Sequence, residues 1–286
     1  MGVVEQVAEH HVRRPLALLR PYADSYTGYR YAGFEPGVHM GLPSRHVTFI
    51  ISFDDRLELT VLPDGRHRPT TFDAMVGGLH TTPAVVRHDG SQHGIQLHLT
   101  PAGTRGLFGL PAGALASTVV PLDALWGRLA GELLERLDAA ATWTERFAVL
   151  EQVMLRALSA RVEIPSGARP EATEAFRRLA AVDGRLGVAE LAADLGWSRR
   201  HLTEQFSVEY GVGPKELARV LRFERSKRLL TTPERGTLAT IAAECGYADQ
   251  AHMARDWRSI AGSSPTRWMA EERLPIVQAD ADGDGA

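Results

Sequence analysis

Polar side chains suited to hydrogen bonding gather on one face of each of two predicted helices near the C-terminal end of the chain. At 100° per residue, Arg200 and Glu204 share the outward face of a helix predicted from about residue 198 to 210. Arg255 lies on the corresponding face of a helix predicted from about residue 249 to 261. An arginine can bind the O6 and N7 atoms of guanine with two hydrogen bonds, and a glutamate can accept one from the amino group of cytosine. The alternatives are an ion pair between Arg200 and Glu204 across one helical turn and, for Arg255, a contact with a phosphate or a neighbouring carboxylate.

These two helices belong to an internal repeat. Residues 191–197 (LAADLGW) align with residues 241–247 (IAAECGY). In each copy a short helix ends at a glycine, which can adopt the left-handed conformation that closes a helix, and a second helix follows. The repeat therefore predicts two helix-turn-helix units, at about residues 188–210 and 238–261. The polar residues that precede the second helices are the predicted N-caps, Ser198 and Asp249.

The inward faces of the two longer helices carry matching apolar pairs. Leu202 and Phe206 are four residues apart, as are Met253 and Trp257, so each pair lies on one face of its helix. Each pair is predicted to pack against the preceding short helix. The one cysteine of the chain, Cys245, falls at a core position of the second unit and is predicted to be a small buried hydrophobe.

Residues from about 171 to 272 resemble the double helix-turn-helix DNA-binding domain of AraC-type transcriptional regulators. The likeness rests on both turns, on a Gly-x-x-Pro after each longer helix, on an arginine-rich connecting helix, and on Ile-Ala-x-x-x-Gly-Tyr in the second unit. It implies a sequence-specific DNA-binding transcription regulator, and an activator, whose two longer helices enter successive major grooves of a double-stranded operator. The other partners that the resemblance implies are RNA polymerase, a small-molecule effector and a second copy of the chain in a homodimer.

The resemblance also implies DNA contacts, residue by residue. The positions that face the bases are Arg199, Arg200, Thr203, Glu204, Gln250, Ala251, His252 and Arg255. The positions that contact phosphate are Ser198, Arg222 and Arg258. The chain departs from the family pattern at Glu204, where the residue is often basic. The arginines of the connecting helix have a second interpretation, as partners in ion pairs within the domain.

The first 160 residues follow a different pattern. Between residues 26 and 99, short apolar runs alternate with turn signals such as PDG and HDGSQ, which is typical of short antiparallel strands in a sandwich or small barrel. From residue 101 to 160 the pattern is helical, with amphipathic stretches at 122–137 and 142–160. The predicted fold class is therefore α+β. A β-rich, cupin-like domain with following helices is predicted for residues 1–160, and an all-α domain comes after it. The resemblance to AraC-type regulators implies that the first is a sensing and dimerisation domain and the second binds DNA.

Boundaries and charge complete this organisation. A linker is predicted at residues 161–169, where Pro and Gly interrupt the helical period, before a DNA-binding domain at 170–273 and an acidic, disordered tail at 274–286. Residues 169–274 hold 17 Lys and Arg against 15 Asp and Glu, a net charge of only +2, so DNA contact must come from the placement of charges. No apolar run is long enough to span a membrane, and no signal peptide is visible, which predicts a cytoplasmic protein.

Histidines raise the alternative of a cupin-like, metal-dependent enzyme fused to a DNA-binding module. Nine of the 11 histidines fall in the first hundred residues, at positions 10, 11, 39, 46, 67, 80, 88, 93 and 98. A metal-binding cupin needs a His-x-His with a downstream Glu and a further His, and His93 with His98 does not supply that spacing. The Gly-x-Ser-x-Gly nucleophile elbow is absent, and no cysteine lies in this half. We therefore expect no catalytic residues, no metal site and no cofactor, and interpret the histidines as scattered over strands and turns or as lining an effector pocket.

Overall fold

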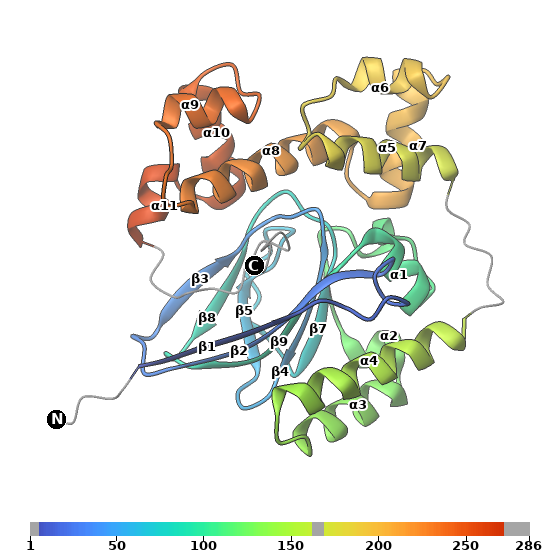
Figure 1. Ribbon diagram of the computed structural model, residues 1–286, viewed down its shortest axis with the longest axis vertical. Helices are drawn as coiled ribbons and strands as arrows, with labels where there is room; N and C mark the ends of the chain where they lie inside the picture. The colour runs from blue at the N-terminus through green and yellow to red at the C-terminus, as the bar shows by residue number, and fades with distance from the viewer. Residues whose placement is uncertain (1–5, 162–168, 272–286) are drawn as a thin grey trace.

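The computed structural model describes residues 6–161 and 169–271. Almost all of the predicted linker at 161–169, and all of the predicted tail at 274–286, lie outside these residues. Both boundaries therefore stay predictions. Figure 1 shows the C-terminal helices above the sheets of the N-terminal domain.

Two antiparallel sheets make up the N-terminal domain. The six-stranded sheet has the order β1 (Val7–Arg13), β2 (Ala23–Ala32), β9 (Gln92–Leu99), β4 (Val47–Ser52), β7 (Ala74–Gly77) and β10 (Val119–Pro121). The four-stranded sheet has the order β3 (Gly37–Gly41), β8 (Ala84–His88), β5 (Leu57–Val61) and β6 (Thr70–Phe72). The predicted β-rich domain is confirmed, but among the described residues no strand pairing closes these sheets into a barrel. The edge strand β10 is short and ends at Pro121, which has no N–H to donate to a further strand.

Strand β4 shows how the six-stranded sheet is packed on both faces. Val47, Phe49 and Ile51 are fully buried in the cluster that includes the helices of the domain. Thr48 and Ile50 point the other way, toward the four-stranded sheet, because successive side chains of a strand alternate. A side chain on Gly28 of β2 would collide with the Trp143 ring, so the glycine lets the ring lie directly on the sheet.

The helices of this domain are α1 (Pro101–Phe108), α2 (Leu122–Trp126), α3 (Arg128–Asp138) and α4 (Trp143–Ser159), with a 3₁₀ turn η1 at Ala112–Leu115. The amphipathic stretch predicted at 122–137 is two helices, since Gly127 adopts a φ of 53° and breaks the helical path. The stretch predicted at 142–160 is one helix, which begins at a capping box between Thr142 and Glu145.

The C-terminal domain consists of seven helices among the described residues. They are α5 (Pro170–Ala181), α6 (Val188–Asp194), α7 (Arg199–Tyr210), α8 (Pro214–Thr231), α9 (Leu238–Glu244), α10 (Gln250–Ala261) and α11 (Pro265–Glu271). The units α6–α7 and α9–α10 are the two predicted helix-turn-helix units, and α8 spans the distance between them (Figure 1). Gly196 and Gly246 take the predicted left-handed conformation, with φ of 70° and 77°. Ser198 and Asp249 are the N-caps, accepting from the backbone N–H of His201 and His252.

The apolar pairs predicted for α7 and α10 point inward. Leu202, Phe206, Met253 and Trp257 are all fully buried, and Cys245 is buried beside the second pair. The helical phase derived from the repeat is therefore correct in both units. None of the helices between residues 6 and 271 that the structure describes is both long and apolar enough to cross a membrane.

Candidate nucleic-acid interface and effector pocket

The face of α7 and α10 opposite the buried pairs is open. The predicted base-facing side chains that are exposed are Arg199, Arg200, Thr203, Glu204, Gln250, Ala251 and Arg255. His252 is half-buried, with its ring edge-on to Tyr247 at 5.3 Å. Ser198 and Arg258, predicted to contact phosphate, are exposed as well. The geometry leaves both helices free to present these side chains to a groove.

The two arginines on these faces differ in their partners. The Nε of Arg200 donates to Oε1 of Glu204 at 2.8 Å, so the ion pair considered as an alternative to base contact is formed here. Arg255 makes no ion pair with any residue in the described part of the chain. The carboxylates beside it are engaged elsewhere, because Asp249 caps α10 and Asp256 binds Arg219 at 3.0 Å. Arg255 therefore has a guanidinium available for an external acceptor.

Arg222, predicted to contact phosphate, is half-buried and contacts other parts of the domain. Its Nη1 donates to the carbonyl oxygen of Gly184 at 3.1 Å, and its guanidinium lies 5.6 Å from the centre of the Tyr247 ring. The side chain thereby joins the turn after α5 to the second unit. Two other arginines of α8 also have partners within the domain, since Arg219 binds Asp256 and Arg225 binds Asp183. Arg219 and Arg225 thus form the ion pairs within the domain that were the second interpretation of the arginines of α8, whereas the hydrogen-bond partner of Arg222 is a backbone carbonyl.

Both longer helices stand with their C-terminal ends on the N-terminal domain. Gly211, which ends α7, packs so closely on η1 that a side chain there would collide with Cβ of Ala116. Gly262, which ends α10, lies beside Met40 of β3. The N-terminal ends of α7 and α10, which carry most of the predicted base-facing residues, are thus turned away from the N-terminal domain.

Ion pairs hold this docked arrangement. The guanidinium of Arg105 in α1 donates two hydrogen bonds to the carboxylate of Glu209 in α7, at 2.8 and 2.5 Å. Arg45, in the loop before β4, donates to Glu224 of α8 from both its backbone N–H and its Nε. Asp183 accepts from Arg45 as well as from Arg225, which ties the loop to the turn between α5 and α6.

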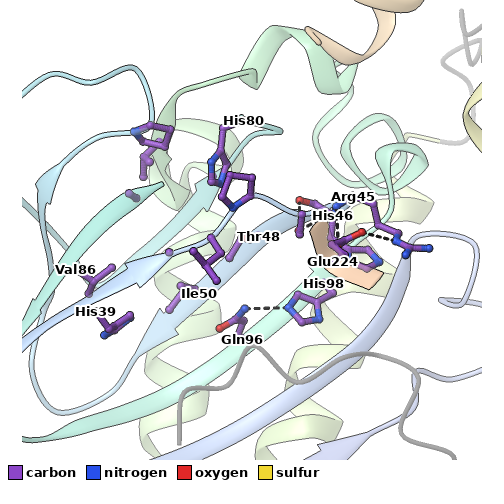
Figure 2. A pocket seen from close by; sticks show the side chains of 18 of the residues that line it. His39, Arg45, His46, Thr48, Ile50, His80, Val86, Gln96, His98 and Glu224 are labelled. Carbon is purple, nitrogen blue, oxygen red and sulfur yellow. Dashed lines mark hydrogen bonds and ion pairs between the residues drawn. The ribbon is translucent and has the colours of Figure 1, made fainter. Parts of the chain in front are cut away.

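A pocket lies between the two sheets, directly beneath α8 (Figure 2). Its cavity has a volume of about 150 Å³. Four histidines from distant positions in the sequence line it, namely His39, His46, His80 and His98. Phe223, Glu224, Lys227 and Arg228 of α8 complete the lining from the C-terminal domain. The sequence contains no signal for this convergence, since it depends on which strands pair.

The family of the C-terminal domain follows from this geometry and from its relatives. Residues 191–271 match the family model described as a helix-turn-helix domain. Residues 191–271 form an AraC-type helix-turn-helix domain. An uncharacterized HTH-type transcriptional regulator of Staphylococcus aureus strain MSSA476 is 29% identical over 86 residues, which cover 30% of this chain and 11% of that protein. The chain thus spans only a small part of the length of the curated relatives it matches.

Solved structures extend the likeness beyond the AraC-type domain. A ToxT variant from Vibrio cholerae, in its apo form, is 13% identical and has a TM-score of 0.53, over 90% of this chain and 99% of that chain. This similarity shows a shared two-domain fold. A transcriptional regulator with an AraC-type DNA-binding domain from Chromobacterium violaceum is 26% identical over 39% of this chain and 100% of that chain, with a TM-score of 0.35.

Two of the histidines that line the pocket beside the AraC-type domain, His39 and His98, have strongly lowered pKa values. The pKa of His98 is lowered to about 3, chiefly by burial and to a smaller extent by nearby His46 and Lys227, which outweigh the opposing effect of Asp24. Burial also lowers the pKa of His39 to about 4, and Nδ1 of His39 is buried without a hydrogen-bond partner in the described residues. Near neutral pH both rings are therefore uncharged. The two ring nitrogens of His98 are already hydrogen-bonded, Nδ1 with Oγ of Ser25 at 3.2 Å and Nε2 with Nε2 of Gln96 at 2.9 Å, whereas Nδ1 of His39 is left for a ligand. The described residues contain no group of three or more His, Cys, Asp or Glu side chains placed to hold a metal ion.

We expect His98 to make the protein less stable in acid. The pKa of His98 is about 3 in the folded chain and 6.5 in the unfolded chain. Between these two pH values the unfolded state therefore binds one proton more than the folded state. The contribution of neutral His98 to the free energy of unfolding is complete above about pH 6.5 and is lost as the pH falls toward 3. At pH 5 the free energy of unfolding is lower by about 2 kcal/mol for this reason. The free energy of unfolding measured by urea titration between pH 5 and 6.5 should change less steeply in His98→Gln, by about one proton. The same change at exposed His67 serves as the control, and an unaltered pH slope in His98→Gln would contradict the assignment.

Proposed function

We propose that the protein is a sequence-specific DNA-binding transcription regulator, an activator that acts inside the cell. The observation that carries this proposal is the arrangement of α7 and α10. Their C-terminal ends lie on the N-terminal domain, their exposed faces hold the predicted base-facing residues, and α8 connects the two units. Successive major grooves on one side of a duplex are about 34 Å apart, so one chain can read two neighbouring half-sites. The family of residues 191–271 supports the same conclusion.

In this proposal the base-reading residues are those predicted from the sequence. The ion pair with Arg200 limits the ability of Glu204 to contact a base. Glu204 shares its carboxylate with Arg200, so a cytosine amino group would have to compete with that guanidinium. Arg258 and Ser198 remain the proposed phosphate contacts. Arg222 instead holds the second unit against the turn at Gly184.

A small-molecule effector in the pocket between the sheets would control DNA binding. Its walls come from both domains, because Glu224 and Lys227 of α8 face the strands. A ligand that binds one arrangement of the domains more tightly than another shifts the equilibrium between them. A molecule with a hydrogen-bonding group suits this pocket, because Nδ1 of His39 is a buried group that such a ligand could satisfy. Dimerisation and contact with RNA polymerase belong to the same proposal and rest on the family resemblance.

The test of base reading rests on Arg255. Arg255→Ala should weaken binding to the cognate operator by about 1–3 kcal/mol and relax the preference at one base pair, since a bidentate contact to guanine discriminates by that amount. Affinities for a library of single-base operator variants, selected from random DNA with the wild-type protein, provide the measurement.

Arg258→Ala is the matched control for this test, because it removes the same charge from the same helix. It should weaken all variants by one factor and lower the slope of log K against log salt by about 1. If Arg255→Ala also weakens every variant by one factor, Arg255 reads no base. If the wild-type protein selects no sequence at all, the proposed function itself is wrong.

A further inference from the structure

A second cavity, which we call the interdomain cleft, lies outside the pocket between the sheets. It has a volume of about 870 Å³. One wall comes from residues 21–24, α1 and the end of α4, and the other comes from α5 and the C-terminal end of α7. Asp24, Arg45 and His46 line both cavities, and Nε2 of His46 lies 2.6 Å from Oδ2 of Asp24. These side chains form the partition between the cleft and the pocket.

The surface of the interdomain cleft combines rings with guanidinium groups. The rings are those of Tyr22, Phe176 and Tyr210, and they come from both domains. The guanidinium groups belong to Arg45, Arg105, Arg161 and Arg177. The carboxylates in the lining are fewer, namely Asp24 and Glu209. The lining therefore holds more guanidinium groups than carboxylates, although Arg45 is paired with Asp183 and Glu224, which lie outside the lining.

Arg161 differs from the other arginines of the interdomain cleft. Arg105 is neutralised by Glu209, and Arg177 by Glu174 one turn away on the same helix. The guanidinium of Arg161 has no ion pair within residues 6–161 and 169–271. It lies on the backbone of Gly109, where any side chain would collide with its Nη1. A cation is thus held against the wall of the cleft with its charge uncompensated.

We propose that the interdomain cleft binds a small amphipathic anion, a molecule with an aromatic or alkyl body and one carboxylate, sulfonate or phosphate group. The body would pack between Tyr22, Phe176 and Leu158, where it is removed from water. Arg161 would donate two parallel hydrogen bonds to the acid group, the geometry for which a guanidinium is suited. The volume is in the range of ligand sites, roughly 300–1,000 Å³.

A ligand in the interdomain cleft would touch both domains at once. Tyr22 and Leu158 belong to the N-terminal domain and Arg161 follows the end of α4, while Phe176 and Tyr210 belong to the C-terminal domain. Binding would therefore stabilise the docked arrangement that Arg105 and Glu209 also hold, by the ordinary linkage between binding and conformation. This site is separate from the effector pocket, and its occupation does not require that the chain bind DNA.

The test uses two fluorescent probes on the full chain. 8-Anilinonaphthalene-1-sulfonate carries the aromatic body and one sulfonate, and N-phenyl-1-naphthylamine has the same body without the charge. We expect the wild-type protein to bind the sulfonate about tenfold more tightly than the neutral probe, as one charge-assisted contact provides. In Arg161→Ala the two affinities should become equal, because the variant removes only the partner of the sulfonate.

Two further variants make the outcome specific to this cavity. Arg136→Ala removes an arginine of α3 that lines neither cavity, and it should leave the tenfold preference intact. Ala180→Trp places a ring in the interdomain cleft from α5 and should weaken both probes. Failure of the wild-type protein to bind the sulfonate saturably, or a preference for the sulfonate that survives Arg161→Ala, would overturn the proposal. Neither result would bear on the reading of DNA by α7 and α10.

Discussion

Trp257→Ala is expected to destabilise the second helix-turn-helix unit by about 3–5 kcal/mol, an effect matched among our predictions only by the corresponding variant of the first unit. The indole is fully buried, with ring centres 4.7 Å from Phe223 and 5.4 Å from Trp268. Its Nε1 also donates to Oγ of Ser226 at 2.8 Å in a buried site. The variant therefore loses apolar burial, leaves a cavity and deprives a buried hydroxyl of a donor. Unfolding monitored by far-UV circular dichroism in urea measures the loss.

Two companion variants separate these contributions. Trp257→Phe keeps most of the apolar area but removes the Nε1 donor, so it should cost about 1–3 kcal/mol. Phe206→Ala removes the corresponding ring of the first unit, where Phe206 contacts Tyr210 at 4.6 Å between ring centres, and should cost as much as Trp257→Ala. DNA binding should fall in step with stability in these variants. A melting transition of Trp257→Ala that coincides with that of the wild type would show that the ring is not part of the core.

The two units could be predicted because the information that specifies them is local. Each contains a glycine with positive φ, a polar N-cap and an apolar pair four residues apart, within about 25 residues of chain. Periodicity also predicted which side chains of α7 and α10 are exposed. It could not predict what Arg222 contacts, because the carbonyl of Gly184 and the ring of Tyr247 come from other helices.

The N-terminal domain shows where local patterns fail. Strand β1 (Val7–Arg13) was not predicted, because most of its side chains are exposed and it lacks an apolar alternation. It forms by pairing with β2 along its whole length. The pocket depends on similar long-range pairing, since Thr48 of β4 meets His98 of β9 across the sheet. The sequence alone does not specify which strands pair, so it could not predict which histidines would line a pocket. Four of the nine, His39, His46, His80 and His98, line this one.

The docking of the first unit on the N-terminal domain yields a second large effect, at Gly211. Gly211→Ala should cost about 2–4 kcal/mol, the sum of two causes. A non-glycine residue at its φ of 72° is strained, and the new methyl group would collide with Cβ of Ala116 and approach Gly113. η1 and α7 cannot stay in contact unless one of them moves. We therefore expect the first unit to separate from the N-terminal domain before it unfolds, which small-angle X-ray scattering would register as a larger radius of gyration.

Gly196→Ala is a control that has the backbone strain of Gly211→Ala without the steric collision. Gly196 has nearly the same φ, 70°, but nothing lies within 4 Å of the position that its Cβ would occupy. It should therefore cost only the strain of the left-handed conformation, about 1–2 kcal/mol, with an unchanged radius of gyration. The difference between the two glycine variants measures how strongly the N-terminal domain holds the first unit. If both variants lose the same stability and keep the same radius of gyration, η1 does not fix the position of α7. The proposed effector would then have no rigid contact at this end through which to reorient α7, the proposed recognition helix.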